Sequence, residues 1–104
     1  MGITENHELS KDGKPFGGQT SGRGFEITWQ RGPLLIDGQR VEPNGAFVQD
    51  VISAAIGRLQ FYQSSDFRCS ENAMAITKLE EAMHWMDHRT QARMARDVEG
   101  TWEV

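Results

Sequence analysis

Cysteine is nearly absent from this sequence, and long apolar runs are missing altogether. The single Cys69 cannot form an internal disulfide, and it cannot supply the paired thiolates of a structural zinc site. No stretch approaches the roughly 18 uninterrupted apolar residues that a membrane-spanning helix requires, and the polar first residues lack the apolar segment of a signal peptide. We expect a protein of a reducing cytoplasm, without a membrane partner.

Basic charge is also scarce. Lys and Arg together number 11 against 15 Asp and Glu, which gives a net charge of -4. Proteins that bind duplex nucleic acid neutralise phosphates with many Lys and Arg, so this balance argues against that class, and any anion site must be local. The sequence also has no phosphate-binding GxxxxGK(S/T) loop, no HExxH zinc motif and no GxSxG nucleophile turn.

The residues that are present suit a folded domain, with 38% apolar and 25% charged residues over 104 positions. A chain of this length buries only about 60 to 68% of its unfolded surface, so we expect a thin core and help from self-association. Residues 1–23 are polar and rich in glycine, which predicts a flexible N-terminal arm.

A β element is predicted over residues 24–43. Phe25, Ile27 and Trp29 alternate with polar residues, which is the period-two pattern of a half-buried strand. Asp37-Gly38 follows a short apolar piece and is a strong turn signal. Together they predict two or three short strands, or a hairpin with one poorly formed arm.

Two helices are predicted after this element. Apolar residues recur at three- or four-residue spacing over residues 46–62, and Asn44 is available to cap the first turn. Residues 71–96 contain no Gly or Pro, and Ser70 is the expected N-cap of this second helix. The helix should end near Gly100.

The predicted fold is therefore α+β. A short N-terminal β-hairpin or small antiparallel sheet is followed by a long antiparallel two-helix hairpin. We expect a flexible arm over residues 1–23 and a single domain over 24–104. That domain comprises the β element over 24–43 and the helical hairpin over 44–104.

One face of the second helix combines apolar and hydrogen-bonding residues. Alternating three- and four-residue spacing defines a seam: Asn72, Ala75, Leu79, Ala82, Met86, Arg89 and Arg93. On an arbitrary helix, Arg89, Arg93 and Arg96 would be cations that complement the helix dipole. Their place in a stripe with Leu79 and Met86 instead directs Arg89 and Arg93 toward a packed surface, and the guanidinium fork is well matched to phosphate.

Asn72 and Arg89 are too far apart in one chain to share a small ligand. They are 17 positions apart, or roughly 25 Å along a helix. An antiparallel pairing of two chains across a two-fold axis would bring Asn72 of one subunit toward Arg89 and Arg93 of the other. This gives the hypothesis of two identical sites between subunits.

Other side chains of this region allow further interpretations. Phe61, Tyr62 and Phe67 offer aromatic faces on which a base could stack, although such rings are more often core. His84 and His88 are four residues apart and could ligate a metal, but such a pair is usually part of a solvated helix face. We expect no metal site.

Three stretches carry a family resemblance: Gly24-Phe25 to Pro33-Leu34, Arg58-Leu59-Gln60-Phe61-Tyr62, and the run from Glu71 to Thr101. In these stretches the sequence resembles the small phage anti-defence proteins of the Thoeris type, together with the related anti-CBASS sponges that share their helical hairpin. The most specific part is Arg89-Thr90-x-x-Arg93, followed by Val98-Glu99-Gly100-Thr101.

The resemblance implies a protein that catalyses no reaction and carries no cofactor. It implies a homo-oligomer, a dimer or a hexamer built from dimers, that sequesters an intact cyclic signalling nucleotide in the host bacterial cytoplasm. Carried over by residue, Asn72, Arg89 and Arg93 would contact ribose or phosphate. Tyr62 would stack on adenine, at a position where the family often has Phe.

The ligand depends on the branch of the family. A β-rich part before the hairpin resembles the Thoeris branch, whose ligand is a cyclic ADP-ribose isomer (glycocyclic ADP-ribose). Cyclic di- or trinucleotides, the ligands of the all-helical anti-CBASS branch, are the alternative, alone or at a second site. Two other classes stay open: an enzyme with Asp97 or Glu99 as general base beside Arg93, and a hairpin that binds another protein through its Met residues and Trp85.

Overall fold

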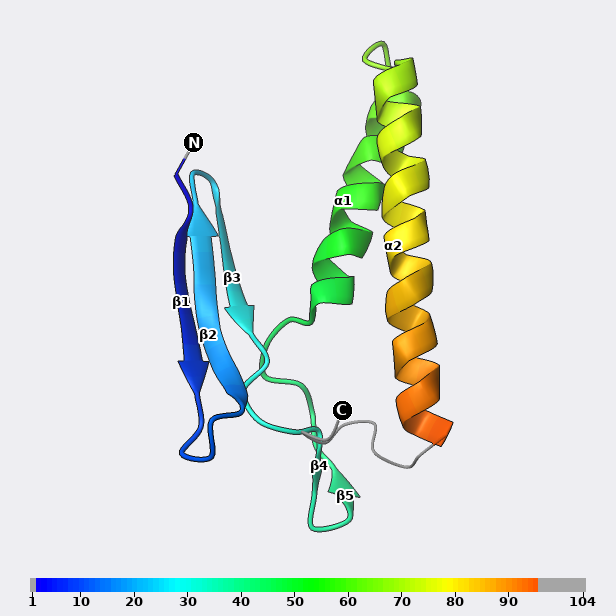
Figure 1. Ribbon diagram of the computed structural model, residues 1–104. Coiled ribbons are helices and arrows are strands. Elements are labelled where there is room, and N and C mark those ends of the chain that lie inside the picture. Colours follow the sequence, from blue (N-terminus) through cyan, green and yellow to red (C-terminus); the bar gives the residue numbers. More distant parts are fainter. Residues whose placement is uncertain (1, 96–104) are drawn as a thin grey trace. The chain divides into compact units, whose positions relative to one another are not determined.

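A computed structural model gives the fold of residues 2–95 and describes the side chains of residues 2–92. These residues form two compact units, one that extends through Phe47 and one over Val48–Ala95 (Figure 1). The first unit is built of strands and the second of two helices, so the predicted α+β class is confirmed. No described helix has the length and apolar character that crossing a membrane requires.

The first unit contains a three-stranded antiparallel sheet in the order β1-β2-β3. Its strands are β1 (Thr4–Leu9), β2 (Pro15–Gly22) and β3 (Phe25–Trp29). The central strand carries the buried Thr20, whose Oγ1 accepts a hydrogen bond of 2.8 Å from the indole N–H of Trp29. This bond joins β2 to β3 on the half-buried face.

Residues 4–22 form two paired strands, whereas composition predicted a flexible arm. The many glycines were interpreted as a source of mobility, but in β2 they allow another backbone to approach closely. Gly18 has a φ of 124°, and a Cβ at this position would collide with the carbonyl oxygen of Asn6 on β1. β2 pairs with β1 and with β3, so residues 4–22 belong to the same unit as β3. The boundary between the two units lies after Phe47 and not at residue 24.

A second small ladder follows, formed by β4 (Leu35–Ile36) and β5 (Gln39–Arg40). The turn between them is Asp37-Gly38, with φ values of 51° and 78°. Two consecutive positive φ values are what a two-residue hairpin turn of the primed type requires, so the predicted turn is confirmed. Leu34, directly before β4, is the buried apolar residue among those described.

Asn44 joins the two ends of the segment that carries β4 and β5. Its Oδ1 accepts a hydrogen bond of 2.8 Å from the Arg31 backbone N–H, and its Nδ2 donates to the Arg31 carbonyl at 3.0 Å. The Asn44 backbone N–H also donates to Oε1 of Gln30 at 2.9 Å. We call these contacts the Asn44 clamp. Asn44 is therefore not the predicted helix cap, because its side chain is fully used by the loop after β3.

The second unit is a helical hairpin of α1 (Val48–Gln63) and α2 (Ser70–Ala95), which lie side by side (Figure 1). Both helices agree with the predicted spans to within a few residues. The predicted end near Gly100 lies outside the described residues. Between the helices the chain reverses through hydroxyl contacts, such as Ser65 Oγ to the Tyr62 carbonyl at 2.6 Å.

Cys69, and not Ser70, caps α2. The Cys69 carbonyl accepts from the Ala73 N–H at 3.3 Å, and its Sγ accepts from the Asn72 N–H at 3.4 Å. Gln63 holds this residue from both sides, since its side chain bonds the Cys69 N–H and carbonyl at 3.0 Å each. Ser70 is the first helical residue, and its hydroxyl donates to the Glu71 carboxylate instead.

The contact between the helices is thin. On α2 the half-buried residues recur at helical spacing and are Asn72, Ala75, Ile76, Leu79, Ala82, Met83, Met86 and Thr90. None of the described hairpin residues is buried, in line with the thin core expected for a short chain. The apolar centre of the predicted seam is thus used within the hairpin, against α1.

Candidate functional site

Tyr62 and Asn72 lie at the turn end of the hairpin, and the same short connection holds both. Tyr62 is half-buried in the last turn of α1, and its carbonyl accepts the Ser65 hydroxyl. Asn72 is half-buried in the first turn of α2, and its Nδ2 donates to the Phe67 carbonyl at 3.2 Å. The structure therefore brings these two predicted site residues to one end of the hairpin.

An exposed aromatic cluster surrounds Tyr62. Its ring centroid is 6.3 Å from that of Phe61 and 6.5 Å from that of Phe67, which meets it edge-on at 83°. Phe61 is 57% exposed and Phe67 is 77% exposed. The alternative that these two rings are core is thus wrong for this chain. Flat faces open to water can accept a base, and such stacking contributes about 1 to 3 kcal/mol per base.

Arg89 lies toward the other end of the hairpin. Its neighbour Thr90 takes the position that faces α1, where its Oγ1 is 3.4 Å from Nε2 of Gln49 in the first turn of α1. Arg89 itself is exposed in the single chain and does not face α1, so the packed surface predicted for it stays a prediction that needs a second chain. It forms no ion pair with a described carboxylate. Its guanidinium is available to a ligand or to another chain.

Arg93 lies in the last described turns of α2, and its side chain is outside the described residues, as is all of Arg96. The helix is continuous from Asn72 to Arg89, which keeps them roughly 25 Å apart. One chain thus divides the four predicted site residues between two ends, as the spacing indicated. The pairing of two chains stays a prediction.

Arg58 also belongs to the aromatic cluster at the turn end of the hairpin, although it is not among the predicted site residues. Its guanidinium carbon lies 5.0 Å from the ring centroid of Phe61 and 5.0 Å from that of Tyr62. The sequence spacing could have indicated this contact, because Arg, Phe and Tyr at positions i, i+3 and i+4 share one helix face. Both distances are within the roughly 6 Å over which a cation is attracted to an aromatic face.

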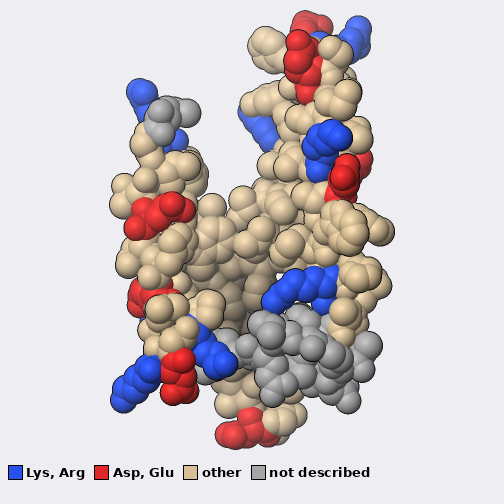
Figure 2. Space-filling model, in the orientation of Figure 1, with Lys and Arg blue, Asp and Glu red and all other residues tan. Residues whose placement is uncertain are grey.

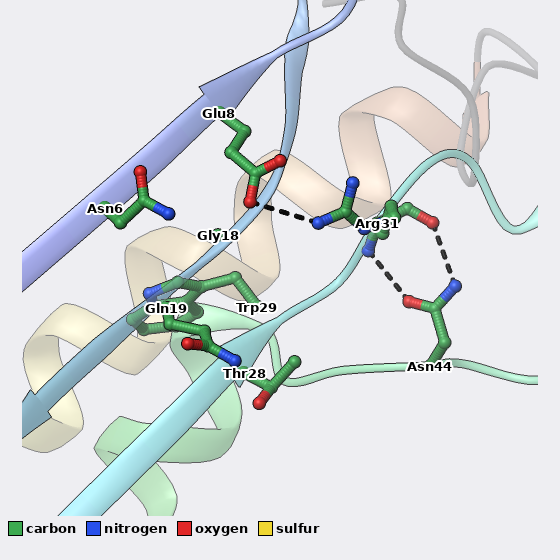
Figure 3. Close-up of a pocket in the computed structure, with 8 residues that line it drawn as sticks. All are labelled: Asn6, Glu8, Gly18, Gln19, Thr28, Trp29, Arg31 and Asn44. Carbon is green, nitrogen blue, oxygen red and sulfur yellow. Dashed lines mark hydrogen bonds and ion pairs between the residues drawn. The ribbon is translucent and has the colours of Figure 1, made fainter.

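A separate hollow of about 370 Å³ opens on the sheet of the first unit (Figure 3). It is lined by Asn6, Glu8, Gly18, Gln19, Thr28, Trp29, Arg31 and Asn44. Asn6, Gln19 and Thr28 are cross-strand partners, so they form one row over the three strands. The predicted site residues whose side chains are described, Tyr62, Asn72 and Arg89, do not line this hollow.

The charge in the hollow is already neutralised. Arg31 passes over Gly17, where a Cβ would lie 3.2 Å from Arg31 Cβ, and its Nη2 contacts Oε2 of Glu8 at 3.1 Å (Figure 3). An arginine that already holds a carboxylate offers little net attraction to a phosphate. Arg58 and Arg89 have no such described partner, so they suit an anion better than Arg31 in the hollow does.

Charge is otherwise dispersed. On the face drawn in Figure 2, acidic and basic side chains are interspersed over each unit and form no broad patch of one sign. Glu71 at the start of α2 has a pKa below its ordinary value of 4.5, first because its own backbone N–H donates to the carboxylate and then because the Ser70 hydroxyl does. On this face, recognition of an anion would therefore come from a few specific side chains.

His84 and His88 flank an exposed tryptophan. Their rings meet that of Trp85 edge-on, with centroids 6.0 and 5.9 Å away, and Trp85 is 63% exposed. Within the part of the chain that the structure describes, no group of three or more His, Cys, Asp or Glu could hold a metal ion.

The family described as "Acb2/Tad1, hairpin domain" matches residues 24–91, which comprise β3, β4, β5, α1 and most of α2. Among curated proteins, Thoeris anti-defense 1 of Bacillus phage SBSphiJ7 is 47% identical over 83 residues. That alignment covers 80% of this chain and 56% of the phage protein, so the chain spans little more than half the length of this relative. Because the family match extends over most of its length, the chain belongs to the Acb2/Tad1 hairpin family, as its resemblance to the phage Thoeris anti-defence proteins predicted.

Proposed function

We propose that the protein inhibits Thoeris anti-phage defence as a non-catalytic sponge for a cyclic ADP-ribose isomer, glycocyclic ADP-ribose, in the host bacterial cytoplasm. The observation that carries the proposal is the division of the site along the hairpin. Tyr62 and Asn72 lie at one end, and Arg89 lies on the same rigid helix near the other. The name of the phage relative supports the same defence system.

The chemistry of each end suits one part of such a ligand. Adenine would stack on the ring of Tyr62, and the amide of Asn72 would bond a ribose hydroxyl. Arg89 and Arg93, one helical turn apart, would hold the pyrophosphate, because arginine binds phosphate oxygens with two parallel hydrogen bonds. Two chains in antiparallel arrangement would complete two such sites, so we propose a homo-oligomer built from dimers.

The four proposed site residues favour binding over catalysis. Asn does not ionise, and Tyr and Arg side chains ordinarily keep their protons at neutral pH, so these residue types are poor general bases for opening a cyclic nucleotide. Sequestration requires only that the ligand is bound tightly and is returned unchanged. An abundant binding protein then lowers the free concentration of the signal by mass action.

The test is recovery of the ligand. The purified protein is incubated with glycocyclic ADP-ribose, separated from free ligand, heat-denatured, and the released nucleotide is identified by mass spectrometry. We expect an intact ligand in stoichiometric amount from the unaltered chain, and none from a chain that carries both Arg89→Ala and Arg93→Ala. Recovery of an opened product would make the protein an enzyme.

A competition arm decides between the ligand classes. Bound glycocyclic ADP-ribose is challenged with a cyclic dinucleotide and, separately, with a cyclic trinucleotide. We expect neither to displace it. Displacement, or tight binding of these nucleotides by a chain that ignores glycocyclic ADP-ribose, would assign the protein to the anti-CBASS class of sponges.

A further inference from the structure

Arg58 lies where it can act on the proposed base-stacking residue. It is one helical turn before Tyr62 on α1, and its guanidinium carbon is 5.0 Å from the centroids of both the Phe61 and Tyr62 rings. A planar guanidinium at this distance attracts the negative face of an aromatic ring and restricts its rotation. Phe67 supports the Tyr62 ring through its edge-on contact.

The turn keeps this arrangement in place. Phe67 is held through its backbone, since its N–H donates to Ser65 Oγ at 3.1 Å and its carbonyl accepts from Asn72 Nδ2 at 3.2 Å. Ser65 in turn donates to the Tyr62 carbonyl. The ring of Tyr62 is therefore in contact with a guanidinium fixed to α1 and with an aromatic ring fixed to the turn. Such pre-ordering lowers the conformational entropy that a ligand has to remove on binding.

Arg58 forms no ion pair with a described carboxylate. The ion pairs between described residues are His7–Glu5, Arg31–Glu8 and Lys78–Glu81, and none includes Arg58. Its positive charge therefore lies beside an open aromatic face without a described carboxylate partner. Paired with a stacking ring, a free guanidinium favours a ligand that joins a base to a phosphate.

We propose that Arg58 is a positioning and specificity residue of the ligand site. It holds the Tyr62 ring in its stacking orientation, and its charge contributes to the selection of an anionic nucleotide. This inference rests on the proposed function for the identity of the ligand. The orientation of the ring is independent of the ligand and can be measured without it.

The sequence provides a convenient probe, because Tyr62 is the one tyrosine of the chain. Protein labelled with 3-fluorotyrosine carries its fluorine reporter on Tyr62 alone. Three variants are compared with the unaltered chain: Arg58→Met, Arg58→Lys and the matched control Arg68→Met. Arg68 is an exposed arginine at the same end of the hairpin, and no contact between it and a ring is among the described aromatic contacts.

In the ligand-free protein, Arg58→Met should shift and broaden the fluorine signal, whereas Arg68→Met should leave it in place. In calorimetry with glycocyclic ADP-ribose, Arg58→Met should weaken binding about ten- to a hundredfold, the usual effect of losing one charged contact. Arg58→Lys keeps the charge without the planar contact and should recover part of the affinity. Circular dichroism checks that α1 stays folded in each variant.

Unchanged affinity in Arg58→Met, or an equal loss in Arg68→Met, would overturn the proposed role in binding. An unchanged fluorine signal in Arg58→Met would overturn the positioning of the ring. If the unaltered chain does not bind glycocyclic ADP-ribose, the proposed function itself is wrong, and the fluorine comparison then decides alone whether Arg58 holds Tyr62.

Discussion

Mixing two inactive variants should restore ligand binding if the site is shared between chains. An Asn72→Ala homodimer lacks the amide at both sites, and an Arg89→Ala homodimer lacks the guanidinium at both. In a mixed dimer, one site collects both changes and the other collects neither. Random exchange of equal amounts makes about half of the dimers mixed, each with one intact site of two. Binding should therefore return to about one quarter of the unaltered number of sites.

The assay is the calorimetric stoichiometry for glycocyclic ADP-ribose after the two variants are unfolded and refolded together. The control is a mixture of Tyr62→Ala and Asn72→Ala chains. These residues lie at the same end of one hairpin, so every site in that mixture keeps one change, and no binding should return. A lack of recovery in the first mixture, with exchange of chains shown by mass spectrometry, would refute the shared site. Equal recovery in both mixtures would refute the assignment of Tyr62 and Asn72 to one subunit.

Three further predictions concern the scaffold. In urea titrations, Gly18→Ala should lower the free energy of unfolding by at least about 2 kcal/mol more than Gly24→Ala does. Both glycines have a positive φ, but only a Cβ at Gly18 would collide with the β1 backbone. Equal losses in the two variants would contradict this. Glu71→Gln should lower the melting temperature above pH 4.5, the ordinary pKa of this carboxyl, and the difference should vanish as acid protonates Glu71 through its lowered pKa. A difference that grows in acid would show the opposite linkage. Cys69→Ser should preserve the cap of α2, whereas Cys69→Ala should lower the free energy of unfolding by about 0.5 to 1 kcal/mol in the same titrations. Equal stability of the two variants would exclude a capping role for the side chain.

The helices were predictable because their signals are local. Residues 71–96 lack Gly and Pro and are rich in good helix formers, and Asp37-Gly38 fits one type of turn, so neighbours along the chain decide both outcomes. The strands in residues 4–22 were not predictable from composition. Their pairing depends on β3, a separate segment of the sequence, and on the close strand approach that Gly18 permits.

The division of the predicted site residues between the two ends of the hairpin was predictable, but the contacts of these residues were not. Spacing alone separates Asn72 from Arg89, and the continuous helix agrees. A three- or four-residue period leaves the exact facing position open, so Thr90 took the place assigned to Arg89. Likewise, Asn44 and Ser70 are good capping residues by type, but a partner distant in sequence engaged the first and Cys69 displaced the second.

The Asn44 clamp has a consequence for how this molecule can change. Its hydrogen bonds to Gln30 and Arg31 close the base of segment 32–43. The pairing of β1, β2 and β3 therefore does not depend on the length of that segment. Each doubling of a flexible loop adds only about 0.6 kcal/mol of closure entropy. We therefore expect insertions at the Asp37-Gly38 tip to leave the three-stranded sheet in place. An epitope or a fluorophore placed there would report on the protein while β1, β2 and β3 stay paired.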